Sequence, residues 1–193
     1  MSLPDFDELK AYLRVTTTVE DDLIEQINLS AQAWVEGYYD VPLESESMTF
    51  RGLWPKIGVQ RLPNTRLVVP VRPCAETGTL TDADEATVST GTYYIDPRTG
   101  YIEAKRHELF SNGPYDLVIR VGWEEHPDYD RKVEPILRQA VLWSASTFYR
   151  NRNVAAIYEQ SGGQVSITYT EEEIPPLLLS LMKRLKDTAW FAS

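Results

Sequence analysis

Acidic side chains concentrate in the stretch EEHPDYD, which contains Glu124, Glu125, Asp128 and Asp130. Two carboxylates that flank a glycosidic bond can hydrolyse it, one as general acid and the other as nucleophile or base. The stretch also comes just before an expected helix, where carboxylates serve as caps and favour the positive end of the helix dipole. Because the chain has 29 acidic residues, neighbouring carboxylates are expected by chance. A hydrolase is therefore one hypothesis, and a structural role for these carboxylates is its alternative.

Metal-binding side chains do not occur at the spacing that a metal site requires. His107 and His126 are separated by 18 residues, and neither has a His or Cys neighbour at ligand spacing. Cys74 is the one cysteine, which excludes an intramolecular disulfide and a cysteine metal cluster. The acidic stretch 82–85 lacks the 12-residue loop with a central glycine that defines an EF-hand. We therefore expect no metal and no cofactor.

Sequence motifs of catalysis are also absent. The chain has no G-x-S-x-G nucleophile turn, no phosphate-binding G-x-x-x-x-G-K and no dinucleotide-binding G-x-G-x-x-G. The SGGQ stretch at 161–164 has two glycines but no strand–turn–helix context. We assign no catalytic or cofactor-binding residue, and we expect that the protein is not an enzyme.

Four segments with helical periodicity are the elements that would position any site. We predict helices over 5–14, 20–37, 134–150 and 176–189. Thr17 and Glu20 have capping-box spacing at the start of the second, and Gly37 is placed near its C-terminal stop. The predicted apolar stripe of that second helix consists of Leu23, Ile27, Ala31, Trp34 and Tyr38.

The third predicted helix is apolar around most of its circumference. Only a narrow strip is polar, formed by Pro135, Gln139, Ser146 and Arg150. A surface helix of a small monomer normally keeps a wide polar face. The other helices and a neighbouring subunit are therefore both expected to cover it. The stripe of the last helix consists of Leu178, Leu181, Met182 and Leu185.

The region 48–123 has the composition of strands. Its β-branched and aromatic runs are broken by Pro and Gly, and YYIDPRTGYIE predicts a hairpin that turns at Asp96 to Gly100. We predict an α+β fold, a small bundle of four main helices with an inserted antiparallel β region. Residues 1–193 would form a single domain, with 1–45 and 131–193 as the helical core and 46–130 as the β-rich insertion. A further short strand is considered at 165–169.

The charge of the chain is −10 and unevenly distributed. Residues 1–50 have net charge −9, residues 51–130 have −3, and residues 131–193 have +2. This balance opposes non-specific binding to nucleic acid, which needs clustered Lys and Arg. We see no secretory signal and no membrane-spanning apolar run, so we expect a soluble protein made in a cytoplasm.

The order of these parts resembles a known family. The chain begins with the helical stretch DELKAYLRV...EDDLIEQINLSAQAWVEGYYD. The strand-like segments come next, in the order LPNTRLVVPVRP, YYIDPRTGYIE and LVIRVGW. The last two segments are helical, VEPILRQAVLWSASTFYRNRN and EIPPLLLSLMKRL. This arrangement resembles the head–tail connector family of tailed phages, also called adaptor or head-completion proteins, in its longer members with a β insertion. VGWEEHPDYD departs from the family, where a strand ending in Ala-Gly-Tyr is usual.

The resemblance implies a structural protein of the virion, located at the head–tail junction and made in the host cytoplasm. It would form a ring of about a dozen copies under the portal, as part of head completion after DNA packaging. Its partners would be itself, the portal protein, and a tail or stopper protein. DNA would pass through the channel without specific binding, which an acidic wall favours.

The C-terminal end supplies the predicted subunit or portal interface. The predicted contact residues are Tyr149, Arg150, Asn151, Arg152, Trp190 and Phe191. Arginines near a helix end could pair with the acidic N-terminal helices of an adjacent subunit. The alternative is that Arg152 caps its own helix and Trp190 packs on its own core. Two other functions stay open: an interaction module unrelated to virions, and a hydrolase that uses Glu124 and Asp128.

Overall fold

The computed structural model describes residues 4–55, 66–105, 110, 113–160 and 174–190, with backbone alone for 152–160 and 187–190. The described chain forms two compact units. A helical unit comprises residues 4–39 and 130–186, and a β unit comprises residues 40–129 together with 187–190. The fold is α+β, as predicted. No helix in the described part of the chain is both long enough and apolar enough to cross a bilayer.

The first helix is α1 (Phe6–Leu13), and it begins and ends with recognisable caps. The Asp5 carboxylate accepts a hydrogen bond from the Glu8 N–H at 2.8 Å, and Arg14 ends the helix with φ 58°. The predicted capping box at Thr17 was wrong, because the next helix starts only at Asp21. The Thr17 carbonyl instead accepts a hydrogen bond from Lys10 Nζ at 3.1 Å, and Lys10 also pairs with Asp21.

The second helix, α2 (Asp21–Tyr39), continues past Gly37, where we had placed its end. Asp40 follows the helix with φ 55°, a left-handed conformation that Asp tolerates, so the stop lies three residues later. Its buried stripe is also shifted by one residue at both ends, since Ile24 and Tyr39 are buried whereas Leu23 is exposed. The buried apolar residues of α2 are Ile24, Ile27, Ala31, Val35 and Tyr39.

The third helix, α3 (Glu134–Gln160), also continues past its predicted end at residue 150. Between Arg150 and Gln160 the sequence has neither Gly nor Pro, so nothing local ends the helix. A short π-helical turn, η2 (Tyr129–Val133), leads into it. Ser146, which we had placed on the polar strip, is buried and donates from Oγ to the Trp143 carbonyl at 3.1 Å.

The broad apolar face of α3 is largely covered within the chain itself. Leu137, Ala140, Val141, Leu142 and Ala145 are all buried. The Trp143 ring contacts the Trp34 ring of α2, with centroids 6.3 Å apart, which supports the expectation that both tryptophans belong to the core. A neighbouring subunit is therefore not needed to bury these residues.

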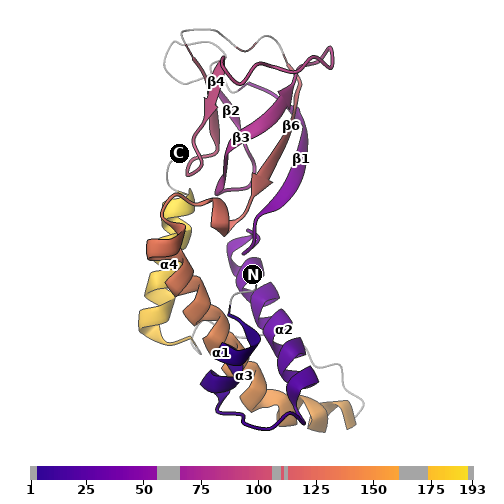
Figure 1. Ribbon diagram of the computed structural model, residues 1–193, viewed down its shortest axis with the longest axis vertical. Coiled ribbons are helices and arrows are strands. Elements are labelled where there is room, and N and C mark those ends of the chain that lie inside the picture. Colours follow the sequence, from indigo (N-terminus) through magenta and orange to yellow (C-terminus); the bar gives the residue numbers. More distant parts are fainter. Residues whose placement is uncertain (1–3, 56–65, 106–109, 111–112, 161–173, 191–193) are drawn as a thin grey trace. The chain divides into compact units, whose positions relative to one another are not determined.

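The last helix, α4 (Pro176–Trp190), is fixed to the end of α2. Three residues of the predicted stripe, Leu178, Met182 and Leu185, are buried, whereas the fourth, Leu181, is only half-buried. Tyr39 Oη donates to the Met182 carbonyl at 3.3 Å, and Lys186 Nζ donates to the Tyr38 carbonyl at 2.7 Å. In the view of Figure 1, α3 runs between α4 on the left and α2 on the right.

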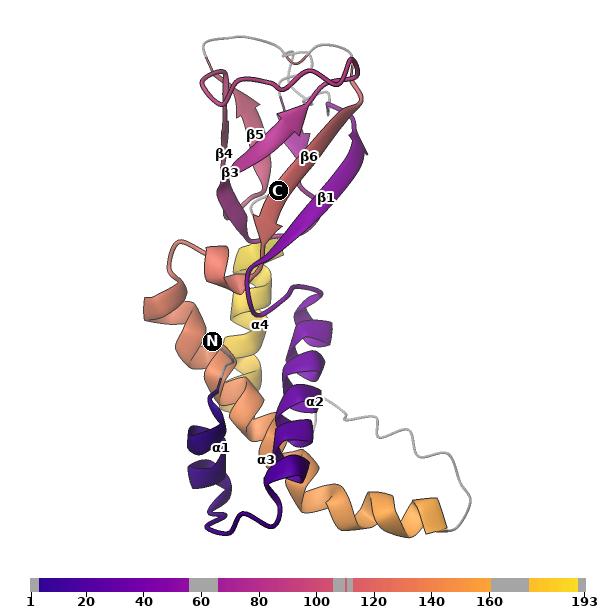
Figure 2. The same cartoon turned by 45° about the vertical axis from the view of Figure 1, so that its right-hand side comes forward.

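Among the described residues, the β unit contains two antiparallel sheets of three strands, where we had predicted one (Figure 2). The strand order is β1-β6-β3 in the first sheet and β2-β5-β4 in the second. A 3₁₀ turn, η1 (Trp123–Glu125), follows the last strand. The strands are β1 (Glu46–Leu53), β2 (Arg66–Val68), β3 (Cys74–Thr81), β4 (Tyr93–Ile95), β5 (Tyr101–Ala104) and β6 (Tyr115–Val121).

The predicted hairpin is confirmed and joins β4 to β5. Asp96 N–H donates to the Tyr101 carbonyl at 2.9 Å, and Gly100 N–H donates to the Asp96 carbonyl at 2.8 Å. Gly100 has φ 64°, the left-handed conformation expected there. The predicted strand at 165–169 lies outside the described residues.

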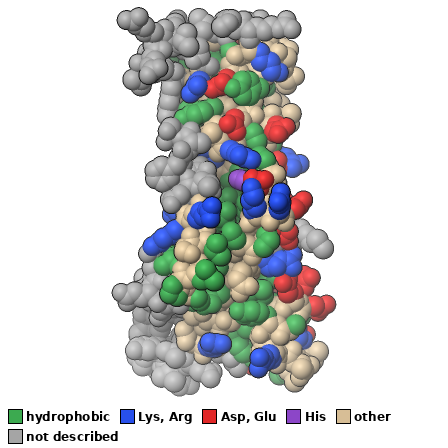
Figure 3. Space-filling model, turned by 90° about the vertical axis from the view of Figure 1, so that its left-hand side faces the viewer, with side chains coloured by type: hydrophobic (Ala, Val, Ile, Leu, Met, Phe, Trp, Pro, Cys, Tyr) green, Lys and Arg blue, Asp and Glu red, His purple; other side chains and the backbone are tan. Residues whose placement is uncertain are grey.

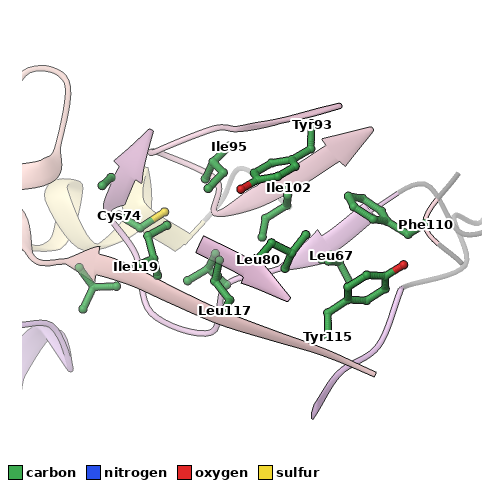
Figure 4. Close-up of a cluster of buried hydrophobic side chains, with 13 residues drawn as sticks. Leu67, Cys74, Leu80, Tyr93, Ile95, Ile102, Phe110, Tyr115, Leu117 and Ile119 are labelled. Atoms are coloured by element: carbon green, nitrogen blue, oxygen red, sulfur yellow. The ribbon is translucent and has the colours of Figure 1, made fainter. Parts of the chain in front are cut away.

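A hydrophobic core fills the space between the two sheets. Figure 4 shows side chains of both sheets pointing toward one another, with Leu80 and Leu117 from the first and Ile102 from the second. The Phe110 and Tyr115 rings meet edge to face at 5.5 Å. Alternation along β6 places Tyr115, Leu117, Ile119 and Val121 inside and the intervening residues outside.

Candidate functional site and assembly surfaces

The acidic stretch that suggested hydrolysis has structural partners in the β unit. Glu124 Oε2 accepts a hydrogen bond from the Ser45 N–H at 3.0 Å. Glu125 Oε1 accepts from Arg120 Nε at 2.7 Å and from the Ser45 hydroxyl. Asp128 pairs with Arg98 at 3.3 Å. Glu124 and Glu125 therefore hold the start of β1 and the end of β6, and Asp128 holds the turn between β4 and β5. This is a structural role, but it differs from the helix capping that we had given as the alternative to catalysis.

Close backbone packing accompanies these contacts. Gly122, between β6 and η1, has φ 140°, and a Cβ built on it would lie 2.4 Å from the Glu44 carbonyl oxygen. A side chain at this position is excluded by both sterics and conformation. The turn is therefore shaped by packing against the segment before β1.

The other candidate ligands also serve local structure. His126 Nδ1 accepts a hydrogen bond from the Asp128 N–H at 3.0 Å. Asp82 Oδ1 accepts from the Asp84 and Ala86 N–H groups at 3.0 and 2.9 Å, which shapes the loop after β3. His107 lies outside the described residues. Within the described ranges, no group of three or more His, Cys, Asp or Glu side chains is arranged to hold a metal ion.

Cys74 lies in the β core and is fully buried. Burial raises the pKa of its thiol to about 12, and the carboxylates of Asp96 and Glu125 act in the same direction. A thiol that stays protonated is a poor nucleophile and a poor metal ligand. Cys74 therefore behaves as a small hydrophobic residue.

The predicted interface residues differ in their contacts and in their exposure. Tyr149 Oη donates to Glu20 Oε2 at 2.5 Å inside the helical unit. Arg150 is exposed and Asn151 is half-buried. Arg152 and Trp190 belong to α3 and α4 by their backbone, but their side chains lie outside the described part, as does the whole of Phe191. Because α3 continues to Gln160, Arg150 and Arg152 lie within the helix and not near its end, where we had predicted them.

The outer face of α2 is an exposed, acidic surface that was not predicted from the sequence. Leu29 is 61% exposed, and the neighbouring Ser30, Ala33 and Gly37 are also exposed. The whole helix has four acidic residues and no Lys or Arg, with Asp22 and Glu25 exposed near its start. We call this surface, residues 22, 25, 26, 29, 30, 33, 36 and 37, the acidic α2 face.

The outer face of α4 has the opposite character. Leu177 is 74% exposed, and Ser180, Lys183 and Arg184 are exposed further along the helix. From residue 176 to 186 the sequence has three basic residues and no acidic one. We call residues 177, 180, 181, 183 and 184 the basic α4 face. Figure 3 views the molecule from the side where α4 lies in Figure 1, and Lys and Arg border hydrophobic side chains there.

Comparisons with known proteins identify relatives of the fold. No protein-family model and no curated protein matches the sequence. The chain is similar to one in the neck of an empty gene transfer agent particle, computed with C6 symmetry. The identity is 20% and the TM-score 0.59, over 95% of this chain and 88% of that chain.

Two further solved structures give nearly the same result. A chain from the virion of the native gene transfer agent particle has 20% identity and a TM-score of 0.59, with coverage of 95% and 88%. A chain from the neck of the native particle, computed with C12 symmetry, has 19% identity and a TM-score of 0.58, with coverage of 95% and 87%. This likeness shows that the folds are shared over nearly the whole chain.

Proposed function

We propose that this protein is a structural component of the neck of a phage-like particle, a head–tail connector or adaptor. The observation that carries the proposal is the fold shared over 95% of the chain with a protein from a particle neck. The order of the sequence elements also resembles the connector family, and this resemblance does not depend on the shared fold. The chain would be located in the virion, at the junction of head and tail.

The local chemistry supports a structural role rather than a catalytic one. Glu124, Glu125 and Asp128, the carboxylates that could have served a hydrolase, hold backbone and arginine groups of their own unit. Burial keeps the thiol of Cys74 protonated. The proposed function needs neither a metal nor a cofactor.

Assembly into a ring is the second part of the proposal. The neck structures that share the fold were computed with C6 and C12 symmetry, which favours a cyclic arrangement of about a dozen copies. The ring would dock on the portal, receive a tail or stopper protein, and extend the DNA channel. The net charge of −10 suits a channel that DNA passes through without being held.

Two finer assignments belong to the same proposal. Residues 46–130 would be an insertion within one domain whose helical core is 1–45 and 131–193. Arg150 and Asn151, together with Tyr149, Arg152, Trp190 and Phe191, would contribute contacts to a neighbouring subunit or to the portal. The exposure of Arg150 supports its place in that set.

A complementation experiment tests the function. Particles assembled without this protein would be incubated with the purified chain, and then with tails, and joined particles would be counted by electron microscopy. We expect the chain to bind at the portal vertex and to restore tail attachment. A chain that leaves tail attachment at the level of untreated particles would contradict the proposal and favour an interaction module unrelated to virions. Hydrolysis that disappears in Glu124→Gln or Asp128→Asn would instead favour the enzyme.

A further inference from the structure

Two side-chain amides of α2 each contain a buried atom to which no other described group is bonded. Asn28 is 7% exposed, and its Oδ1 has no hydrogen-bond partner among the described residues. Gln32 Nε2 is buried as well and likewise has no partner within the described part of the chain. Burial of an unpaired polar atom is unfavourable, so such atoms in native proteins are bound to protein groups or to ordered water.

The two amides are neighbours on the helix and have complementary chemistry. Asn28 and Gln32 are separated by four residues, slightly more than one turn, so they lie on the same side of α2. Cβ atoms at this separation are about 5–6 Å apart. The Asn28 oxygen accepts a hydrogen bond and the Gln32 nitrogen donates one. A single small molecule that both donates and accepts would therefore satisfy both atoms.

The other half of the Asn28 amide explains why its oxygen has no partner there. Asn28 Nδ2 donates to the Pro4 carbonyl at 3.3 Å. Pro4 is buried and precedes Asp5, the N-cap of α1. Proline has a carbonyl but no backbone N–H, so Pro4 cannot donate to Asn28 Oδ1 in return. The contact that attaches the start of α1 to α2 therefore uses only half of the amide.

Buried side chains surround this contact. Ile24, Ala31 and Val35 of α2 are fully buried, and so is Leu9 of α1. The helix α1 packs against both α2 and α3 (Figure 2). A molecule held at the two amides would therefore be separated from the bulk solvent and would be a stable part of the structure.

The pairing of one donor with one acceptor selects the chemical class of the ligand. The Asn28 oxygen repels an anion, and the Gln32 N–H group repels a cation. An apolar molecule would leave both atoms unpaired. Water both donates and accepts, and buried waters typically bind polar groups that have no other partner.

We infer that one buried water molecule bridges Gln32 Nε2 and Asn28 Oδ1. The water accepts a hydrogen bond from Gln32 and donates one to Asn28, which keeps the Asn28 amide turned with its Nδ2 toward Pro4. The water is thereby part of the attachment of the start of α1 to α2. The inference goes beyond the proposed function and does not depend on it, because it concerns the interior of the helical unit.

Nuclear magnetic resonance of the full-length, isotope-labelled chain tests for the water directly. Nuclear Overhauser contacts between water and the side-chain NH₂ protons of Gln32 and Asn28 would be measured, and rotating-frame spectra would separate these contacts from chemical exchange. We expect the Gln32 protons to contact a water molecule that tumbles with the protein. Gln26 is the matched control, an exposed glutamine on the same helix, and its water contacts should have the sign of short-lived surface hydration.

Two substitutions test whether the water links the amides energetically. Gln32→Met removes the donor and should lower the melting temperature, and Asn28→Leu should do the same, because each leaves the other amide unpaired. We expect the double variant to lose less than the sum of the two single losses. Gln26→Met is the control and should shift the melting temperature by no more than about 2 °C.

The two measurements together separate the water bridge from other arrangements. A direct hydrogen bond between the two amides would also give non-additive losses, but the Gln32 protons would then show no contact to a long-lived water. The absence of that contact in the wild-type chain would overturn the inference, whether or not the variants fold. Additive losses would overturn it as well. Neither result affects the proposed neck function, which the complementation experiment tests separately.

Discussion

Two glycines of this chain have opposite consequences for stability. Gly122 has φ 140° and is in contact with the backbone of Glu44, whereas Gly37 is helical and faces open space. We predict that Gly122→Ala lowers the free energy of unfolding by about 3 kcal/mol through clash and backbone strain. Gly37→Ala should raise it by up to about 1 kcal/mol in the unassembled chain. Urea unfolding of the two variants measures both values, and equal effects of the two substitutions would contradict this assignment.

Cys74 gives a second test at the scale of a single residue. Its pKa of about 12 means that the thiolate form is scarce at pH 8, and burial also blocks access. We predict that a maleimide or disulfide reagent labels the native protein slowly at pH 8 and labels the urea-unfolded protein quickly. Rapid labelling of the folded chain would show that the β core is open or that Cys74 lies at its surface.

The helix α3 holds the helical unit together through its buried side. Leu137 is fully buried at the start of that side, whereas Gln139 is exposed two residues later. We predict that Leu137→Ala lowers the free energy of unfolding by about 2–5 kcal/mol because a cavity remains. Gln139→Ala should change it by less than about 0.5 kcal/mol. Chemical unfolding followed by circular dichroism compares the two variants, and a similar loss in both would mean that α3 is packed differently.

The elements that sequence could predict are those with local causes. The β4–β5 hairpin follows from Asp96 and Gly100, whose preferences alone shape the turn. The ends of α2 and α3 were placed too early because Gly37 and the polar run after Tyr149 resemble stop signals. The buried stripe of α2 was shifted because Leu23 and Ile24, like Tyr38 and Tyr39, offer two adjacent apolar residues. Only packing decides which member of each pair is buried.

The division of the β region into two sheets could not be predicted from local patterns. β1 pairs with β6 across more than sixty residues of chain, and no local signal specifies such a pairing. The exposed faces of α2 and α4 could not be predicted from the sequence for a related reason. Leu29 and Leu177 are recognisable as exposed only after the buried sides of α2 and α4 are known.

At the scale of the whole molecule, the charge distribution is the property that assembly would use. Residues 1–50 have a net charge of −9 and residues 131–193 have +2. In the ring that we propose, these regions of neighbouring copies would attract each other. Such contacts weaken as salt screens them, whereas apolar contacts between subunits do not. Ring formation should therefore diminish, without disappearing, as the salt concentration rises.

Electron microscopy of the purified chain mixed with its portal tests the central claim most directly. We expect a closed ring of this chain stacked on the portal, coaxial with it, with an open central channel. Portals that remain bare in the presence of excess protein would contradict the proposed function.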